Sequence, residues 1–214
     1  MIRLDVFSDP VCPWCYIGKA HLDRALAAAP DHPFVIAWHP FQLNPDMPRE
    51  GRDRAEYLEA KFGGRDKAAR AYAQVEAAAL QAGIEMDVAS VPRAPNTLDA
   101  HRLIHWAGIE GRQTAMVSAL FRAYWRERRD IGDAGILATI AGEVGLDSAA
   151  IARLLASDAD RDDILARDAD ARAKGVNAVP TFLIAQSYVV SGAQSPAFWG
   201  NVIAELRQRA KTAG

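Results

Sequence analysis

The sequence predicts an α/β protein in which a βαβ segment and a ββα segment share one sheet, with a block of helices between them. Two observations support this. Strand-like patterns occur near the two ends of the 214 residues, whereas residues 52–174 are rich in Ala, Leu, Arg and Asp at helical spacings. The length suits one large domain or a small domain with an insertion. We therefore expect residues 1–48 and 175–214 to form one discontinuous domain, and residues 49–174 to form an inserted helical domain.

The N-terminal segment is typical of a β-α-β unit. Residues 2–8 (IRLDVFS) alternate and then stop at Asp9-Pro10, as a short strand does. Residues 33–43 are aromatic and β-branched, which predicts a second strand with Pro40 at its end or at a sheet edge. Residues 12–29 suit a connecting helix whose inward side would carry Ile17, Leu22, Ala25, Leu26 and Ala29. The two strands would then be parallel and joined by a right-handed crossover.

The central block has helical spacing almost throughout. Glycines divide it into expected helices at residues 68–82, 97–108, 113–127, 133–144 and 160–174. The last of these has three acid–base pairs in the favourable order, four residues apart: Asp163/Arg167, Asp168/Arg172 and Asp170/Lys174. Gly175 follows at the position of a C-terminal cap.

After Gly175 the β pattern returns. Two short apolar runs, residues 182–184 and 188–190, flank a polar turn and predict a hairpin. A closing helix is expected at residues 196–211, with Ser195 as its N-cap and Pro196 in its first turn.

Composition argues against several classes of partner. The formal net charge of −2 provides no general attraction to phosphate, so we expect no nucleic-acid binding. No apolar run approaches the roughly 18 residues of a membrane span. Asp5 and Asp9 interrupt the apolar region that a secretory signal would need, so we expect a cytoplasmic protein.

Both cysteines of the chain lie in the segment PVCPWCYIGK, three positions apart. A lone structural disulfide tends to be reduced in the cytosol, where a CxxC pair more often serves catalysis or metal binding. A metal site would need two more ligands. His101 and His105 have a suitable i, i+4 spacing, but they lie far along the chain and we expect them to be ordinary helix residues.

The segment CPWC fits the start of a helix. With Cys12 at the N-cap, Pro13 takes the first helical position, where its missing N–H is tolerated. The Cys12 sulfur could then accept hydrogen bonds from the N–H groups of Trp14 and Cys15, and the helix dipole would also favour the thiolate. We expect Cys12, at an exposed helix tip, to attack disulfides, and the more buried Cys15 to resolve the mixed disulfide.

Other candidate residues have two interpretations each. Asp5 could be a buried proton acceptor for Cys15, but an outward-facing strand residue is the preferred interpretation, and His39 is interpreted in the same way. Asn96 is expected to cap the helix that begins at Thr97, with a ligand contact as the alternative. From the residues alone, the Val179-Pro180 bond is expected to be trans, as most X–Pro bonds are.

Several segments together resemble the DsbA family of thioredoxin-fold proteins over essentially the whole chain. They are FSDPVCPWCYIGK, WHPFQLNP, PNTLDAHRL, GVNAVPTFLI and SGAQS. They are similar to the FrnE-like cytosolic branch, which neighbours the 2-hydroxychromene-2-carboxylate isomerases and the kappa-class glutathione transferases. The resemblance implies a thioredoxin fold with a large all-helical insertion between its βαβ and ββα halves.

The resemblance also implies a function. Cys12 and Cys15 would form the redox pair of a dithiol–disulfide oxidoreductase or isomerase, and the Val179-Pro180 bond would be cis. The substrates would be disulfide-containing or unfolded polypeptides, with glutathione as a thiol co-substrate or a thiol reductase as electron partner. No metal or organic cofactor is implied, and a homodimer is considered. Substrate contacts are expected from Pro13, Trp14, Val179, Pro180, Thr181 and Asn96.

Two departures from the family pattern matter. Trp14 stands where the oxidising periplasmic members have His, which puts strong oxidising power in doubt. The transferases and isomerases generally have Ser at the position of Cys12, and an Asp-Arg pair where this chain has Gln194-Ser195. A glutathione-dependent small-molecule isomerase or transferase of the 2-hydroxychromene-2-carboxylate isomerase type remains the alternative.

Overall fold

A four-stranded sheet joins the two ends of the chain, as predicted. The computed structural model describes residues 1–86 and 88–212, so Asp87 of the expected insertion and residues 213–214 lie outside the description. In the strand order β2-β1-β5-β6, β1 is parallel to β2 and antiparallel to β5, and β5 is antiparallel to β6. The strands are β1 (Ile2–Ser8), β2 (Phe34–Pro40), β5 (Thr181–Ile184) and β6 (Tyr188–Ser191).

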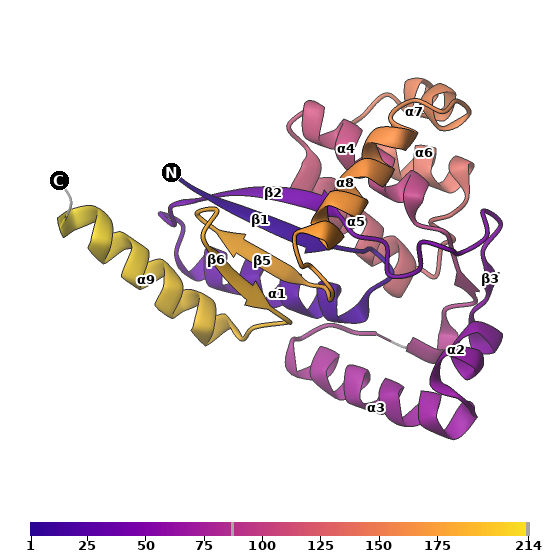
Figure 1. The fold of residues 1–214 in the computed structure, drawn as a ribbon, viewed down its shortest axis with the longest axis horizontal. Coiled ribbons are helices and arrows are strands. Elements are labelled where there is room, and N and C mark those ends of the chain that lie inside the picture. The colour runs from indigo at the N-terminus through magenta and orange to yellow at the C-terminus, as the bar shows by residue number, and fades with distance from the viewer. Residues whose placement is uncertain (87, 213–214) are drawn as a thin grey trace.

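Helices cover both faces of this sheet (Figure 1). The helices α1 (Pro13–Ala28) and α9 (Pro196–Thr212) lie next to each other, and α8 (Arg161–Ala173) crosses the opposite face. The buried Trp199 of α9 packs against Phe182 of β5, with ring centroids 4.7 Å apart. Because α1 follows directly on β1, the CPWC segment lies at the carboxyl edge of the sheet.

The insertion contains the five expected helices, each close to its predicted bounds, and two helices that were not predicted, α2 and α7. The helix α2 forms a hairpin with α3, and η1 (Val88–Ser90) is a single 3₁₀ turn. The other helices that precede α8 gather beside β2 (Figure 1). Their bounds are α2 (Arg54–Phe62), α3 (Arg65–Gln81), α4 (Leu98–Ile109), α5 (Gln113–Trp125), α6 (Ala134–Glu143) and α7 (Ser148–Leu155).

The expectation of an all-helical insertion is wrong in one respect. Two short strands within it, β3 (Arg52–Asp53) and β4 (Arg93–Ala94), pair in antiparallel orientation. Asp and Ala are depleted in strands and Arg is not among the residues that favour them, so nothing local indicates this ribbon. The pairing arises because the α2–α3 hairpin leaves the sheet domain and returns at the same place.

The second strand lies at an edge of the sheet and stops where predicted. It ends at Pro40, and the next residues form a loop whose backbone N–H groups bond to distant carboxylates. The Gln42 N–H donates to Asp168 over 2.9 Å, and the Leu43 N–H donates to Asp9 over 2.7 Å. Buried carboxylates therefore replace a neighbouring strand as the hydrogen-bond partners of this segment.

The predicted caps at Gly175 and Ser195 and the predicted ion pairs of α8 are confirmed. Gly175 has φ +91°, and its N–H bonds to the Arg172 carbonyl while the Val176 N–H bonds to that of Ala171, which completes a Schellman cap. The Ser195 hydroxyl accepts a bond from the Phe198 N–H. All three acid–base pairs of α8 form. No helix in the described part of the chain is long and apolar enough to cross a membrane.

Candidate functional site

Cys12 occupies the N-cap of α1, as predicted, and Pro13 follows in the first turn. Of the two N–H groups expected to bond its sulfur, that of Cys15 does so, with N and Sγ 3.4 Å apart. The Cys12 Sγ also lies 3.6 Å from the Val179 carbonyl oxygen, to which the thiol donates. Both cysteines are free thiols in this structure. The two halves of the sheet domain therefore meet at the Cys12 sulfur.

The expectation that Cys12 lies at an exposed helix tip is wrong. Cys12 is 3% exposed and Cys15 is 1% exposed, whereas Trp14 is 40% exposed. The Val179 carbonyl lies against the Cys12 sulfur. Cys12 nevertheless lines a cavity of about 390 Å³, together with Pro13, Trp14 and Val179. A substrate would therefore reach Cys12 through this cavity, which the insertion helps to build.

The cavity has a polar group on the wall that the α2–α3 hairpin supplies. Lys61 Nζ donates to the Tyr57 hydroxyl over 2.8 Å, and that hydroxyl donates to Asn44 Oδ1. The buried Arg54 also lines the cavity. Sequence reasoning missed Arg54, Tyr57 and Lys61 because α2 was not predicted, and it missed Asn44 because a single loop residue carries no local signal.

The Val179-Pro180 peptide bond is cis, as the resemblance implies and contrary to the expectation from the residues alone. The Pro180 ring packs against α1 at Gly18. A Cβ atom at Gly18 would lie 3.0 Å from Pro180 Cγ and 3.4 Å from the Cα of Ala193. Glycine at this position therefore allows α1 and the Pro180 loop to approach closely, which holds Val179 beside Cys12.

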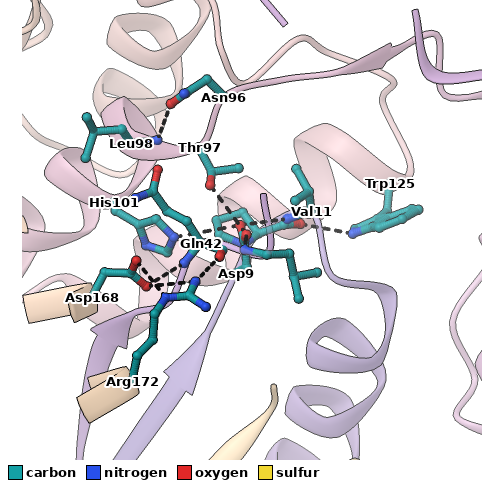
Figure 2. Close-up of polar contacts among 12 residues, drawn as sticks. Asp9, Val11, Gln42, Asn96, Thr97, Leu98, His101, Trp125, Asp168 and Arg172 are labelled. Atoms are coloured by element: carbon teal, nitrogen blue, oxygen red, sulfur yellow. Dashed lines mark hydrogen bonds and ion pairs between the residues drawn. The ribbon is translucent and has the colours of Figure 1, made fainter. Parts of the chain in front are cut away.

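Two predicted substrate contacts have internal partners instead. The Thr181 hydroxyl donates to the Ala178 carbonyl over 2.7 Å. Asn96 Oδ1 accepts from the Leu98 N–H over 2.9 Å, and Asn96 Nδ2 donates to the Met47 carbonyl over 2.7 Å (Figure 2). The predicted N-cap is off by one residue, because Thr97 is the N-cap and α4 begins at Leu98. Thr181 and Asn96 do not line the cavity over Cys12.

The preferred outward-facing interpretation of Asp5 is wrong. Asp5 is 4% exposed, and its Oδ1 lies 2.6 Å from Nε2 of His39 and 2.6 Å from Nε of Arg3. Burial lowers the pKa of His39, and Asp5 opposes that effect. The face of the sheet that carries this pair is covered by α8, which the alternation within β1 does not reveal. None of the contacts found among the described residues joins Asp5 to a cysteine.

A second carboxylate, that of Asp9, is buried between the loop after β2 and the start of α4 (Figure 2). Asp9 is fully buried and accepts hydrogen bonds from the Leu43 N–H, the Val11 N–H and the Thr97 hydroxyl. Burial outweighs these bonds and raises the pKa of Asp9 to about 7. Sequence reasoning used Asp9 to mark the end of the first strand and to argue against a secretory signal, and did not identify it as a site residue.

His101 of α4 faces Asp9 from the insertion. Its Nε2 lies 3.7 Å from Asp9 Oδ1, and burial lowers the pKa of His101 to about 3. The backbone of Asp9 also contacts the redox pair, since its carbonyl accepts a bond from the Cys12 N–H over 2.9 Å. Asp9 thus connects the cysteines, the loop after β2 and the insertion.

Cys15 is held as a neutral thiol. Burial, followed by the neighbouring Cys12, raises the pKa of Cys15 well above its ordinary value, whereas the Asp9 backbone and the Ser8 hydroxyl act in the opposite direction. A buried thiol must lose its proton before it can attack a disulfide. Cys12 is therefore placed to react first, and Cys15 can resolve only when a proton acceptor is available.

The opposite pKa shifts of Asp9 and His101 predict how stability depends on pH. The raised pKa of Asp9 stabilises the fold below pH 3.8, and this contribution is lost as the pH rises to about 7. The lowered pKa of His101 stabilises the fold above pH 6.5, and this contribution is lost as the pH falls to about 3. Between about pH 4 and 6.5, the folded and unfolded states bind the same number of protons at this pair. The contributions of Asp9 and His101 to the change of unfolding free energy with pH therefore cancel.

In Asp9→Asn the contribution of Asp9 to the pH dependence of stability is removed, and we expect the contribution of His101 to remain. The free energy of unfolding of the variant should rise with pH more steeply than that of the wild type, by up to about 1.4 kcal/mol per pH unit. Urea unfolding at several pH values between about 4 and 6.5 measures this. The double variant Asp9→Asn/His101→Gln is the control, and its free energy of unfolding should change with pH as that of the wild type does. If Asp9→Asn alone also shows the wild-type pH dependence, the opposite pKa shifts of Asp9 and His101 are contradicted.

Comparisons with known proteins agree with this geometry. The profile of the DSBA-like thioredoxin domain family matches residues 3–204. An uncharacterized protein of Bacillus subtilis, YwbO, is 28% identical over 200 residues, which cover 92% of this chain and 94% of that protein. The crystal structure of a probable DsbA oxidoreductase from Streptomyces coelicolor has a TM-score of 0.86 and 30% identity, covering 96% of this chain and 89% of that one.

Two more distant structures show the same fold. A 2-hydroxychromene-2-carboxylate isomerase has a TM-score of 0.75 at 16% identity and covers 99% of both chains. The cytosolic disulfide reductase DsbM from Pseudomonas aeruginosa, in a structure with GSH, has a TM-score of 0.69 at 19% identity, covering 97% of this chain and 99% of that one. At these identities the likeness extends to the fold and no further.

Proposed function

Because the chain belongs to the DSBA-like thioredoxin domain family, we propose that it is a thiol–disulfide oxidoreductase that reduces or isomerises disulfides through Cys12 and Cys15. One observation carries the proposal: the Cys12 sulfur caps α1, accepts the Cys15 N–H and opens into a cavity. The N-cap position and the helix dipole stabilise a thiolate, which is the reactive form.

The reaction follows from the placement of the two sulfurs. The Cys12 thiolate attacks one sulfur of the substrate disulfide, releasing one substrate thiolate and forming a mixed disulfide. Cys15 then loses its proton and attacks the Cys12 sulfur, which releases the second thiolate and leaves a Cys12–Cys15 disulfide. Positions i and i+3 of a helix are close enough for this bond. The two electrons return from glutathione or from a thiol reductase.

Two features support a substrate that enters as an extended segment or as a small disulfide. The Val179 carbonyl faces Cys12 and can accept a hydrogen bond from a substrate backbone. Trp14 offers a large, partly exposed ring at the cavity mouth. We propose disulfide-containing polypeptides or small disulfides as substrates, and a cytosolic setting like that of DsbM. In a cytosol poised near −220 to −320 mV, the reduced enzyme would be populated if its own reduction potential lies above this range.

A second candidate function is a glutathione-dependent isomerase or transferase. The likeness of the fold to 2-hydroxychromene-2-carboxylate isomerase and the cavity with Lys61, Tyr57 and Asn44 on one wall favour a small-molecule substrate. In this case Cys12 would act alone, with glutathione as co-substrate.

Equilibration in graded glutathione redox buffers tests the proposed function. We expect a single two-electron transition between the dithiol and the Cys12–Cys15 disulfide, read by alkylation of free thiols and mass spectrometry. A midpoint near about −270 mV would mark a reductase, and one near about −180 mV or above an isomerase or oxidase. A stable glutathione adduct on Cys12 with no Cys12–Cys15 bond would contradict the dithiol mechanism and favour the second candidate.

A further inference from the structure

Arg54, the first residue of α2, is a buried cation that lines the cavity over Cys12. It is 6% exposed, and its Cζ lies 5.4 Å and 5.3 Å from the ring centroids of Tyr72 and Trp125. Its Nη1 donates to the Val88 carbonyl over 2.5 Å. No carboxylate in the described part of the chain forms an ion pair with it. A positive charge is therefore buried at the cavity without a negative partner.

The two tyrosines that Arg54 faces do not neutralise its charge. Burial raises the pKa of Tyr72 and of Tyr124, and Arg54 opposes this effect only in part. Both phenols therefore remain uncharged near neutral pH. The Tyr124 hydroxyl donates to the Arg93 carbonyl over 2.9 Å, whereas the buried Tyr72 hydroxyl has no acceptor for its proton among the described residues. Because both tyrosines line the same cavity, an unused donor accompanies the unpaired cation.

The rest of the cavity also favours a negative group. Among the described residues that line it, Arg54 and Lys61 carry the charges, and none is Asp or Glu. Lys61 is exposed and donates to the Tyr57 hydroxyl rather than to a carboxylate. Since an unpaired buried charge is costly, a negative group brought by a ligand would stabilise this site. The cavity is thus positively charged in a chain whose formal net charge is −2.

We propose that Arg54 binds a carboxylate of the substrate, and that the cavity selects small acidic disulfides. The inference rests on the proposed disulfide chemistry at Cys12 and names its substrate class. A guanidinium can bind a carboxylate through two parallel hydrogen bonds, and the Tyr72 hydroxyl can donate a third. With the substrate so held, the Cys12 thiolate attacks one sulfur. The S–S bond breaks, and the other half leaves as a thiolate with the electron pair.

The enclosure of Cys12 favours a small disulfide over a polypeptide. Cys12 is 3% exposed and lines a cavity of about 390 Å³, a size typical of small-molecule sites. The α2–α3 hairpin, which supplies the cations, lies beside α1 (Figure 1). A polypeptide continues on both sides of its disulfide cysteine and would need the hairpin to move, whereas a small disulfide can enter the cavity by itself.

Three small disulfides of similar size test the proposal on the wild-type protein. Dithiodipropionate carries two carboxylates, hydroxyethyl disulfide is neutral, and cystamine carries two ammonium groups. The rate constant for oxidation of the reduced protein by each, divided by that for oxidation of dithiothreitol, removes differences in intrinsic reactivity. We expect the acidic disulfide to react faster than the neutral one by on the order of 10- to 100-fold, and cystamine to be the slowest.

The outcomes separate the inference from the proposed function. Equal normalised rates for the three disulfides would overturn the acidic selectivity and leave the dithiol function intact. A faster reaction with oxidised insulin than with dithiodipropionate would also overturn it, in favour of a polypeptide substrate. If none of these disulfides oxidises the protein, the proposed function fails, and the inference fails with it.

Arg54→Met assigns the selectivity to a residue. We expect this variant to slow the reaction with the acidic disulfide on the order of 10-fold more than the reaction with the neutral one. Arg24→Met is the matched control, because Arg24 donates to the Ala82 carbonyl after α3 over 2.9 Å but does not line the cavity. Its three rates should match the wild type. Equal slowing of all three in Arg54→Met would overturn the inference, because Arg54 would then act on Cys12 or on the fold.

A binding measurement needs neither a variant nor disulfide exchange. Thiodipropionate has the two carboxylates but no disulfide, and thiodiethanol is its neutral counterpart. We expect thiodipropionate to slow the alkylation of Cys12 by the uncharged reagent iodoacetamide, with a saturable dependence on concentration, and thiodiethanol to have little effect. Mass spectrometry identifies the alkylated cysteine. Absence of protection by thiodipropionate would overturn the carboxylate site even if the dithiol function holds.

Discussion

Cys12→Ser is expected to reduce disulfide exchange to the rate of the uncatalysed reaction, the largest effect of any single substitution. The thiolate is the nucleophile, and a serine hydroxyl at the same N-cap cannot replace it at neutral pH. The helix itself should be retained, because serine is a preferred N-cap residue. Reduction of insulin by a thiol reductant measures the activity, and circular dichroism verifies the fold. Residual catalysis well above background would contradict the role of Cys12.

Cys15→Ser is the matched variant and distinguishes the two candidate functions. In the dithiol mechanism the first attack persists, but the mixed disulfide on Cys12 accumulates and turnover falls nearly to zero. A glutathione-dependent isomerase or transferase uses Cys12 alone, so the same variant should retain its turnover. Mass spectrometry of the trapped adduct would also identify the class of substrate, since a polypeptide and a small thiol differ greatly in mass.

Arg102→Met is expected to have the largest effect on stability, a loss of about 3–5 kcal/mol in the free energy of unfolding. Arg102 is 1% exposed and donates to Asp99 over 2.7 Å and to the carbonyls of Ala159, Leu154 and Ser157 over 2.8–2.9 Å. The guanidinium thus ties α4 to the connection between α7 and α8. Methionine fills the space but removes the donor of all four hydrogen bonds.

Urea unfolding measures this loss, and two variants serve as controls. Arg102→Lys keeps the charge but cannot reach all four acceptors, so its loss should be intermediate. Arg65→Met removes an exposed arginine that pairs with Glu59, and should leave the unfolding midpoint nearly unchanged. A loss in Arg102→Met no greater than in Arg65→Met would show that the buried network contributes little.

The parts of the molecule that depend on neighbouring residues could be predicted from the sequence. Cys12 at the N-cap and Pro13 after it identify the start of α1, because capping involves a few consecutive residues. Gly175 marks the end of α8 for the same reason. The cis form of the Val179-Pro180 bond was predicted only by the resemblance to a family, since the residues alone favoured a trans bond.

The parts that depend on distant segments could not be predicted. Asp5 and Asp9 look alike in a short strand pattern, and only the placement of α8 and α4 shows that both are buried and that Asp9 contacts the cysteine loop. The exposure of Cys12 was misjudged because nothing local shows that the α2–α3 hairpin, some 40 to 70 residues further along the chain, faces it across a cavity. The β3–β4 ribbon could not be predicted either, because its residues give no local strand signal.

Local periodicity and short hydrogen-bonded caps predict the βαβ and ββα segments, the redox pair and its place at the start of a helix. Packing between distant segments brings Asp9, His101 and the loop after β2 together and encloses the cavity over Cys12. Burial sets the protonation of Asp9, His101 and Cys15, and burial is a property of the packed chain rather than of any segment within it.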